Sequence, residues 1–79
     1  MNAVSLSGMK QGERCVVRII NVAAELRQRL GDLGMYPGSQ IMCAYIAPSG
    51  SPIAFWVKGT LIALRREDCL LIRGESCCG

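Results

Sequence analysis

Five segments of the chain carry the short apolar runs and the two-residue alternation that are typical of β-strands. They are residues 14–20, 40–46, 53–58, 60–64 and 69–73. Turn-forming residues separate them, and strands at this spacing indicate a small barrel or sandwich. Because five strands that close on themselves leave few unpaired edges, the pattern favours a mainly β fold built as a small five-stranded barrel.

The same alternation assigns side chains to the two faces of each predicted strand. In residues 14–20 it places Cys15, Val17 and Ile19 on one face and the intervening residues on the other. Both faces are mostly apolar, as expected in a small barrel whose outer surface is partly covered. The corresponding sets in the next two strands are Ile41, Cys43 and Tyr45, and Ile53, Phe55 and Val57.

One segment changes its period from two residues to between three and four. Leu26, Leu30 and Leu33 recur at the spacing of one helical stripe, which predicts a helix over residues 22–33. Asn21 precedes it and could cap its first free amides. The sequence therefore predicts one short helix between the first and second strands.

The connection from this helix to the second strand is rich in glycine and proline. Gly34 is suited to the left-handed conformation that ends a helix, and Pro37-Gly38 fits the centre of a type II turn. These structural turn residues do not account for Met35 and Tyr36, two large side chains in a tight connector. Either at least one of them packs in the core, or both form an exposed apolar spot beside the helix.

The length and composition predict a single small domain. We expect it over residues 1–74, followed by a flexible tail at 75–79. Of the 79 residues, 51% are hydrophobic, so some apolar surface should meet a partner or a second copy through an edge strand. No apolar run approaches the ~18 residues of a helical membrane span, and the first ten residues lack a signal-peptide pattern. We therefore expect a cytoplasmic protein that reaches a membrane only through a partner.

The five cysteines are typical of a reducing compartment. Cys15, Cys43 and Cys69 stand singly in apolar runs, where thiols act as small hydrophobic side chains. Cys77 and Cys78 are adjacent near the end of the chain and lack the C-x-x-C spacing of a metal site. An odd number without regular spacing does not suggest a disulfide framework.

The residue types that enzymes commonly use are missing or scattered. The chain has no histidine, so it lacks the usual general base near neutral pH. Its glycines at 31, 34 and 38 do not match a phosphate-binding loop. Ferrous iron prefers imidazole and carboxylate ligands, and without histidine the chain offers no imidazole. We therefore expect no catalytic residue, no cofactor and no metal site.

Four blocks together resemble the ferrous iron transport protein A (FeoA) family. They cover nearly the whole chain from residue 5, and the Leu-Gly-x-x-Pro-Gly signature followed by Ala-Leu-Arg-Arg is the most specific part. The first block departs from the family at Gln11, where proline is common. The blocks are "SLSGMKQGE" (5–13), "LRQRLGDLGMYPGSQI" (26–41), "APSGSPIAFWVKG" (47–59) and "LIALRREDCLLI" (61–72).

This resemblance implies an SH3-like barrel and a partner. Proteins of the family are thought to assist the B component of ferrous iron uptake, a membrane permease with a cytoplasmic G-protein domain. The assistance is described as binding, and stimulation of nucleotide hydrolysis has been suggested. A similar barrel stands at the C-terminus of iron-dependent repressors, whose DNA-binding helical domain has no room in this chain.

The unexplained connector residues give the first hypothesis for a docking site. Arg27 and Arg29 on the predicted helix, with Met35, Tyr36 and Pro37 after it, combine residue types that are enriched in protein interfaces. We expect these five residues to contact the permease. On this hypothesis, Met35→Asp would leave folding largely intact and weaken binding.

Two other functions remain open from the residues alone. A small barrel could bind nucleic acid through Lys58, Arg65, Arg66 and Arg73 around Trp56, but the net charge of +3 comes without a basic stripe, so we expect no nucleic-acid partner. The two adjacent arginines could also approach a phosphate of a partner, but a charged tight turn in which Glu67 and Asp68 neutralise them explains them better. A module that responds to ferrous iron or zinc is the second alternative.

Overall fold

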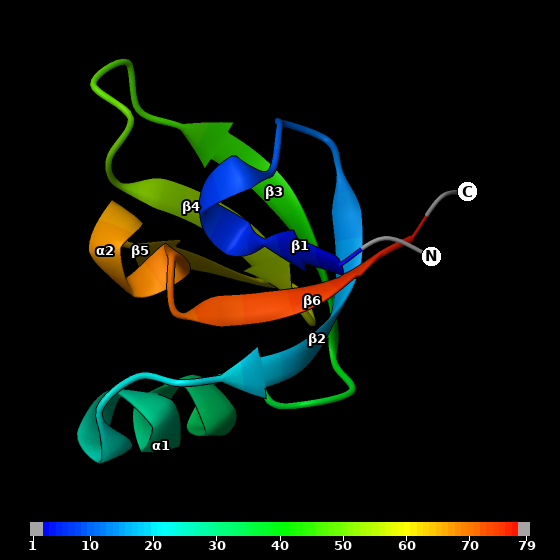
Figure 1. Ribbon diagram of the computed structural model, residues 1–79, viewed down its shortest axis with the longest axis vertical. Helices are drawn as coiled ribbons and strands as arrows, with labels where there is room; N and C mark the ends of the chain where they lie inside the picture. The colour runs from blue at the N-terminus through cyan, green and yellow to red at the C-terminus, as the bar shows by residue number, and fades with distance from the viewer. Residues whose placement is uncertain (1–2, 78–79) are drawn as a thin grey trace.

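A computed structural model describes residues 3–77 of the chain. Its strands form one antiparallel sheet in the order β1-β6-β2-β3-β4-β5, which curls around an apolar interior (Figure 1). The strands are β1 (Ala3–Ser5), β2 (Arg14–Ile20), β3 (Gln40–Ile46), β4 (Ile53–Val57), β5 (Thr60–Leu64) and β6 (Ile72–Ser76).

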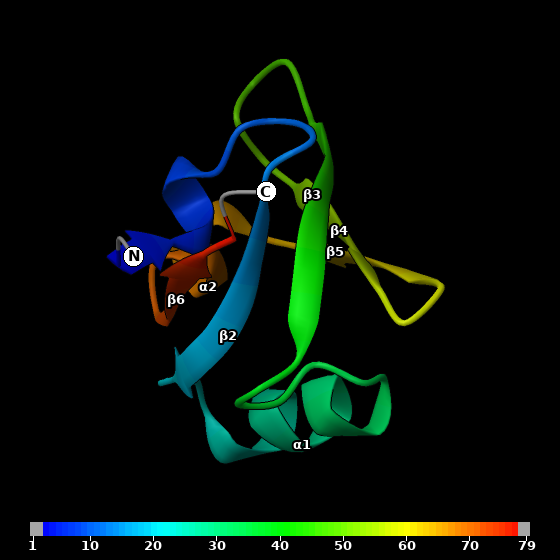
Figure 2. The same ribbon diagram turned by 90° about the vertical axis from the view of Figure 1, so that its right-hand side faces the viewer.

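Three short helical elements complete the described part of the chain. The 3₁₀ turn η1 (Leu6–Gly8) follows β1, α1 (Ala24–Asp32) connects β2 to β3, and α2 (Arg66–Cys69) connects β5 to β6. Figure 2 shows α1 lying across the ends of β2 and β3. The structure therefore contains a mainly β fold with one substantial helix.

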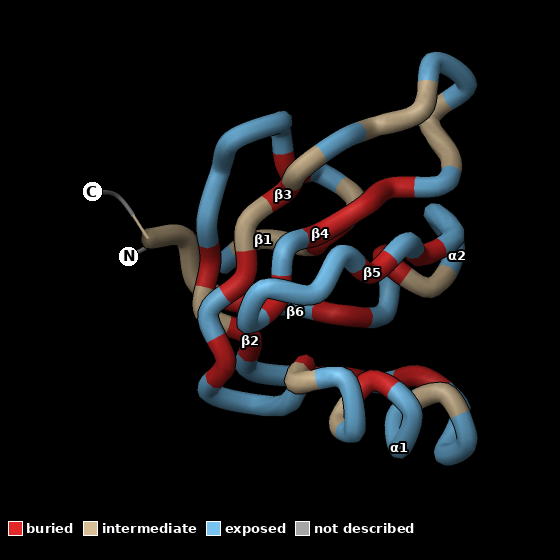
Figure 3. Tube along the Cα trace, turned by 180° about the vertical axis from the view of Figure 1, so that it is seen from behind, coloured by how far each residue is buried: buried red, intermediate tan, exposed pale blue. Residues whose placement is uncertain are grey.

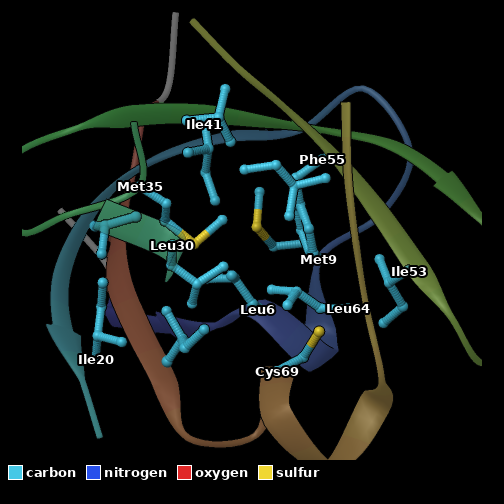
Figure 4. Close-up of a cluster of buried hydrophobic side chains, with 14 of the residues drawn as sticks. Leu6, Met9, Ile20, Leu30, Met35, Ile41, Ile53, Phe55, Leu64 and Cys69 are labelled. Carbon is cyan, nitrogen blue, oxygen red and sulfur yellow. The ribbon is translucent and has the colours of Figure 1, made fainter. Parts of the chain in front are cut away.

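The inner side of the sheet and one side of α1 enclose the core (Figure 3). Alternation places Ile53, Phe55 and Val57 of β4 inside, each with no exposed surface. Leu6 and Met9 close the core from the η1 side, and Figure 4 shows both pointing into the same apolar cluster. Burial of these side chains is the main stabilising contribution.

Two β-bulges change the facing that strict alternation predicts. The register of β2 against β6 shifts between Val17 and Ile19, and that of β3 against β4 shifts between Cys43 and Tyr45. Each bulge inserts one extra residue, so the side chains beyond it change face. Ile19 and Tyr45 are consequently 57% and 53% exposed, contrary to the prediction that they share a face with the buried cysteines.

The structure has six strands among the described residues where the sequence predicted five, and its last strand begins and ends later in the chain than predicted. The alternation missed β1, which pairs with β6. The last strand begins at Ile72 rather than residue 69, because residues 66–69 form α2. It continues to Ser76, so residues 75 and 76 belong to the sheet and not to a tail; Cys78 lies outside the described residues.

The helix begins later than its apolar stripe predicts. Ala23 precedes the first helical residue and provides no side-chain cap. The side chain of Asn21 therefore does not cap α1; its backbone N–H instead donates to the carbonyl oxygen of Leu71 at 2.9 Å. Of the predicted stripe, Leu30 is buried and Leu26 packs partly against the core, whereas Leu33 lies at the end of the helix with 40% exposure.

Candidate docking surface

The way in which α1 ends explains why the Met35 side chain points into the core. The N–H of Gly34 donates to the carbonyl of Gly31 at 3.0 Å, and the N–H of Met35 donates to that of Leu30 at 2.7 Å. Together with the φ of +106° at Gly34, these two bonds define a Schellman motif, which places the residue after the glycine against the last inner residue of the helix.

Met35 is therefore a core residue and not part of an exposed contact. It has no exposed surface, and Figure 4 shows it beside Leu30 in the apolar cluster. The expectation that Met35→Asp leaves the fold intact is wrong, because the carboxylate would be buried without a partner. The sequence rule for this motif, an apolar contact across the glycine, was the signal that could have identified Met35.

The turn after Met35 presents Tyr36 and Pro37 at the surface. The N–H of Ser39 donates to the carbonyl of Tyr36 at 2.9 Å, and Gly38 has a φ of +99°. This arrangement fits the predicted type II turn. The hydroxyl of the buried Ser39 also donates to the carbonyl of Tyr36, at 2.8 Å. The turn is thus held from within while its first two side chains stay exposed.

Tyr36 contacts a lysine that the sequence does not place near it. The Nζ of Lys58, in the turn between β4 and β5, lies 4.4 Å from the centre of the Tyr36 ring and also donates to the Tyr36 hydroxyl. A cation over an exposed aromatic ring contributes about 0.5–1 kcal/mol. Twenty-two residues separate the pair, so no local pattern could have predicted it.

The two arginines of the expected site do not form one helix face. Arg27 and Arg29 are both exposed on α1, but residues two apart lie about 200° apart around a helix. They therefore flank the buried Leu30 from opposite sides. Arg29 is in the last turn, next to the connection that leads to Tyr36.

The residues of the nucleic-acid alternative are exposed but spread over separate elements. Trp56 is 44% exposed on β4, Arg65 and Arg66 stand at the start of α2, and Arg73 is on β6. Lys58 is engaged with Tyr36. None of the contacts found among residues 3–77 joins these five residues to one another. The arrangement gives no particular support to a nucleic-acid site.

The single cysteines lie in the core. Cys15, Cys43 and Cys69 have no exposed surface and are free thiols. Burial raises the pKa of Cys15 to about 11 and that of Cys69 to about 12, and it also raises the pKa of Cys43. Because the thiolate is the reactive form, these thiols are poor nucleophiles and poor metal ligands near neutral pH.

Metal-ligand clusters and membrane-spanning helices are both absent from the described residues. Residues 3–77 contain no group of three or more histidine, cysteine or acidic side chains that could hold a metal ion. Cys77 is half-buried, and its N–H donates to the carbonyl of Arg14 at 2.9 Å. No helix within this range is both long and apolar enough to cross a membrane.

Comparison with known proteins identifies the family of this fold. The model of the FeoA domain matches residues 4–76. The chain belongs to the FeoA domain family. The match begins within β1 and ends with the last residue of β6, so it includes residues of every strand of the sheet.

Solved structures of FeoA proteins are closely similar. The FeoA protein of Chlorobium tepidum is 32% identical, with a TM-score of 0.86 over 91% of this chain and 70% of that one. An iron uptake regulatory protein (FeoA) is 26% identical, with a TM-score of 0.84 over 96% of this chain and 100% of its own.

A third similar protein is the zinc-complexed FeoA of Stenotrophomonas maltophilia. It is 25% identical, with a TM-score of 0.71 over 87% of this chain and 86% of that one. It is described as a prokaryotic SH3 domain protein and was suggested as a ferrous iron transport activating factor. The FeoA family is thus associated with ferrous iron transport, and an SH3-like fold is recognised within it.

Proposed function

We propose that this protein is a cytoplasmic, non-catalytic accessory component of ferrous iron uptake. It docks on the cytoplasmic G-protein region of the ferrous iron permease and modulates transport. The observation that carries the proposal is the FeoA match over residues 4–76, because similar FeoA proteins bear names of iron uptake and transport. With no helix of membrane-spanning character among residues 3–77, attachment to the membrane runs through the permease.

The docking surface we propose is centred on the turn after α1. Tyr36 and Pro37 are exposed there, and the Nζ of Lys58 lies over the Tyr36 ring. Because an aromatic side chain has few rotatable bonds, it loses little conformational entropy on binding, which favours an interface. Arg29 in the last turn of α1 adds positive charge beside it, and Arg27 extends the surface to the other side of the helix. Met35 supports this surface from inside the core.

Binding to the isolated G-protein region of the permease tests both parts of the proposal. We expect the wild-type protein to bind the immobilised region, and Tyr36→Ala to weaken the affinity about tenfold, since central aromatic residues dominate interface energies. Biolayer interferometry with and without guanine nucleotide measures the affinity. Hydrolysis of GTP in the same mixtures shows whether binding also changes the rate.

Tyr45→Ala is the matched control. Tyr45 is also an exposed tyrosine, but it lies near the end of β3 that is remote from α1. Equal binding by the two folded variants would exclude the Tyr36 surface. Absence of binding by the wild type would contradict docking altogether. In cells that lack this protein, ferrous iron uptake should be restored by the wild type and by Tyr45→Ala, but poorly by Tyr36→Ala.

A further inference from the structure

One edge of the sheet lacks the features that usually protect an edge strand. The strands at the two edges are β1 and β5. Natural edge strands are protected by short length, charge, proline or a bulge. The strand β1 has only three residues, whereas β5 has five, contains no charged residue or proline, and pairs with β4 without a register shift.

The outward backbone groups of β5 follow from its hairpin. Both residues of the two-residue turn between β4 and β5 have positive φ, 49° and 81°, as in a type I′ turn. Val57 and Thr60 therefore form a hydrogen-bonded pair, and hydrogen bonding alternates along the ladder. The N–H and C=O groups of Leu61 and Ala63 consequently point away from β4. Within residues 3–77 these four groups have no hydrogen-bond partner.

The side chains beside these groups form an apolar surface. Leu61 of β5 lies directly opposite Trp56 of β4, and the two are 53% and 44% exposed. Ala63 is exposed as well and leaves room above the edge. A strand added to β5 would place its own outward side chains against Leu61 and close to Trp56.

The charged residues at the two ends of β5 indicate which kind of strand could pair with this edge. Lys58 precedes β5, and Arg65 and Arg66 follow it; all three are exposed. In the part of the chain that the structure describes, the one ion pair joins Arg18 to Glu75, so none of these three cations forms an ion pair, although Glu67 and Asp68 follow the arginines in α2. In an antiparallel pair of β5 strands, Lys58 of one copy would face Arg65 and Arg66 of the other, whereas a segment with acidic ends would face cations at both of its ends.

We propose that β5 binds an extended apolar segment of another protein that carries acidic residues at both ends. The segment would form a seventh strand, with four backbone hydrogen bonds to Leu61 and Ala63. This is the β-augmentation mode of recognition, in which main-chain bonds supply affinity and flanking groups supply selectivity. The site lies on a different strand from Tyr36 but shares Lys58 with the Tyr36 surface, and it stands whether or not the protein docks on a permease.

Two synthetic peptides with one core and opposite flanks test the proposal. The first has the sequence Asp-Asp-Val-Thr-Val-Thr-Val-Asp-Asp, and the second has lysine in place of each aspartate. Trp56 is the only tryptophan, so its fluorescence reports binding at this edge. Amide hydrogen exchange observed by NMR shows whether Leu61 and Ala63 become protected.

We expect the acidic peptide to bind saturably, to protect both amides, and to bind at least about tenfold more tightly than the lysine peptide at low salt. The difference should shrink as salt is raised, because exposed charges are screened. Equal binding of the two peptides, or binding without protection of these amides, would overturn the proposal. Protection that grows with protein concentration in the absence of peptide would instead indicate a second copy, and would also overturn it.

Two variants locate the contact. Ala63→Pro removes an outward N–H without removing a bond to β4, so it should fold and bind the acidic peptide about tenfold more weakly. Ala63→Thr keeps the N–H and should bind like the wild type. If the proline variant fails to fold, Arg65→Glu with Arg66→Glu replaces it and should abolish the preference for acidic flanks. An unchanged preference in that double variant would contradict the proposal.

Discussion

Gly74 shows how closely the backbones pack at the β2 bulge. It pairs with Val17 of β2, at the point where the register with β6 shifts. A Cβ placed on Gly74 would overlap the carbonyl oxygen of Val16 and lie 3.2 Å from the Sγ of Cys15. Backbone atoms cannot move aside as a flexible side chain can, so this position requires glycine for its size rather than for its φ angle.

We predict that Gly74→Ala destabilises the protein by about 2 kcal/mol or more, because the methyl group forces β6 away from β2. Gly31→Ala is the control. No atom lies within 4 Å of a Cβ added there, and the residue is helical. That substitution should stabilise by up to about 1 kcal/mol. Urea unfolding followed by circular dichroism measures both. Equal stabilities of the two variants would show that β2 and β6 can separate at little cost.

The connection between α1 and β3 is the element that links the core to the proposed docking surface. Its Schellman motif turns Met35 inward, and the type II turn that follows leaves Tyr36 outside. Adjacent residues thus perform opposite tasks, one anchoring the helix and one available for contact. The glycine at 34 permits this reversal because it adopts a φ of +106° without a Cβ penalty.

We predict that Met35→Asp costs at least about 3 kcal/mol and unfolds a large fraction of the protein, because a carboxylate would replace a fully buried side chain. Met35→Leu keeps the volume and should cost less than about 1.5 kcal/mol. Thermal unfolding of both variants tests this. A cooperative transition of Met35→Asp near the wild-type midpoint would place Met35 outside the core.

At the scale of the whole molecule, the sheet is completed by its last strand. The strand β6 lies between β1 and β2, so it joins the two parts of the chain that come first in sequence. Glu75 pairs with Val16 on one side and Ala3 on the other, and its Oε1 lies 2.7 Å from the Nε of Arg18. This exposed ion pair contributes little, whereas the backbone pairing of β6 joins β1 to β2.

We predict that deleting residues 75–79 lowers the stability by about 2–3 kcal/mol, since several ladder hydrogen bonds and their packing are lost. Glu75→Gln isolates the ion pair and should cost less than about 1 kcal/mol. Urea unfolding distinguishes the two variants. If the deletion costs no more than Glu75→Gln, the backbone pairing beyond Gly74 contributes little to stability.

Local patterns in the sequence predicted much of this arrangement. Two-residue alternation identified the strands at 14–20, 40–46 and 60–64, and the spacing of Leu26 and Leu30 identified α1. The glycine at 34 marked its end. These features are local, because strand and helix periods depend on neighbouring residues that face the same environment. The four blocks of resemblance also indicated the FeoA family, which the comparison confirms.

Only the tertiary structure decided where the pattern is interrupted and what faces outward. The bulges beyond Val17 and Cys43 depend on the partner strands, so alternation could not show that Ile19 and Tyr45 are exposed. The pairing of Tyr36 with Lys58 joins distant segments for the same reason. Short-range periodicity thus determined the elements of this protein, whereas long-range pairing determined its edges and its surface.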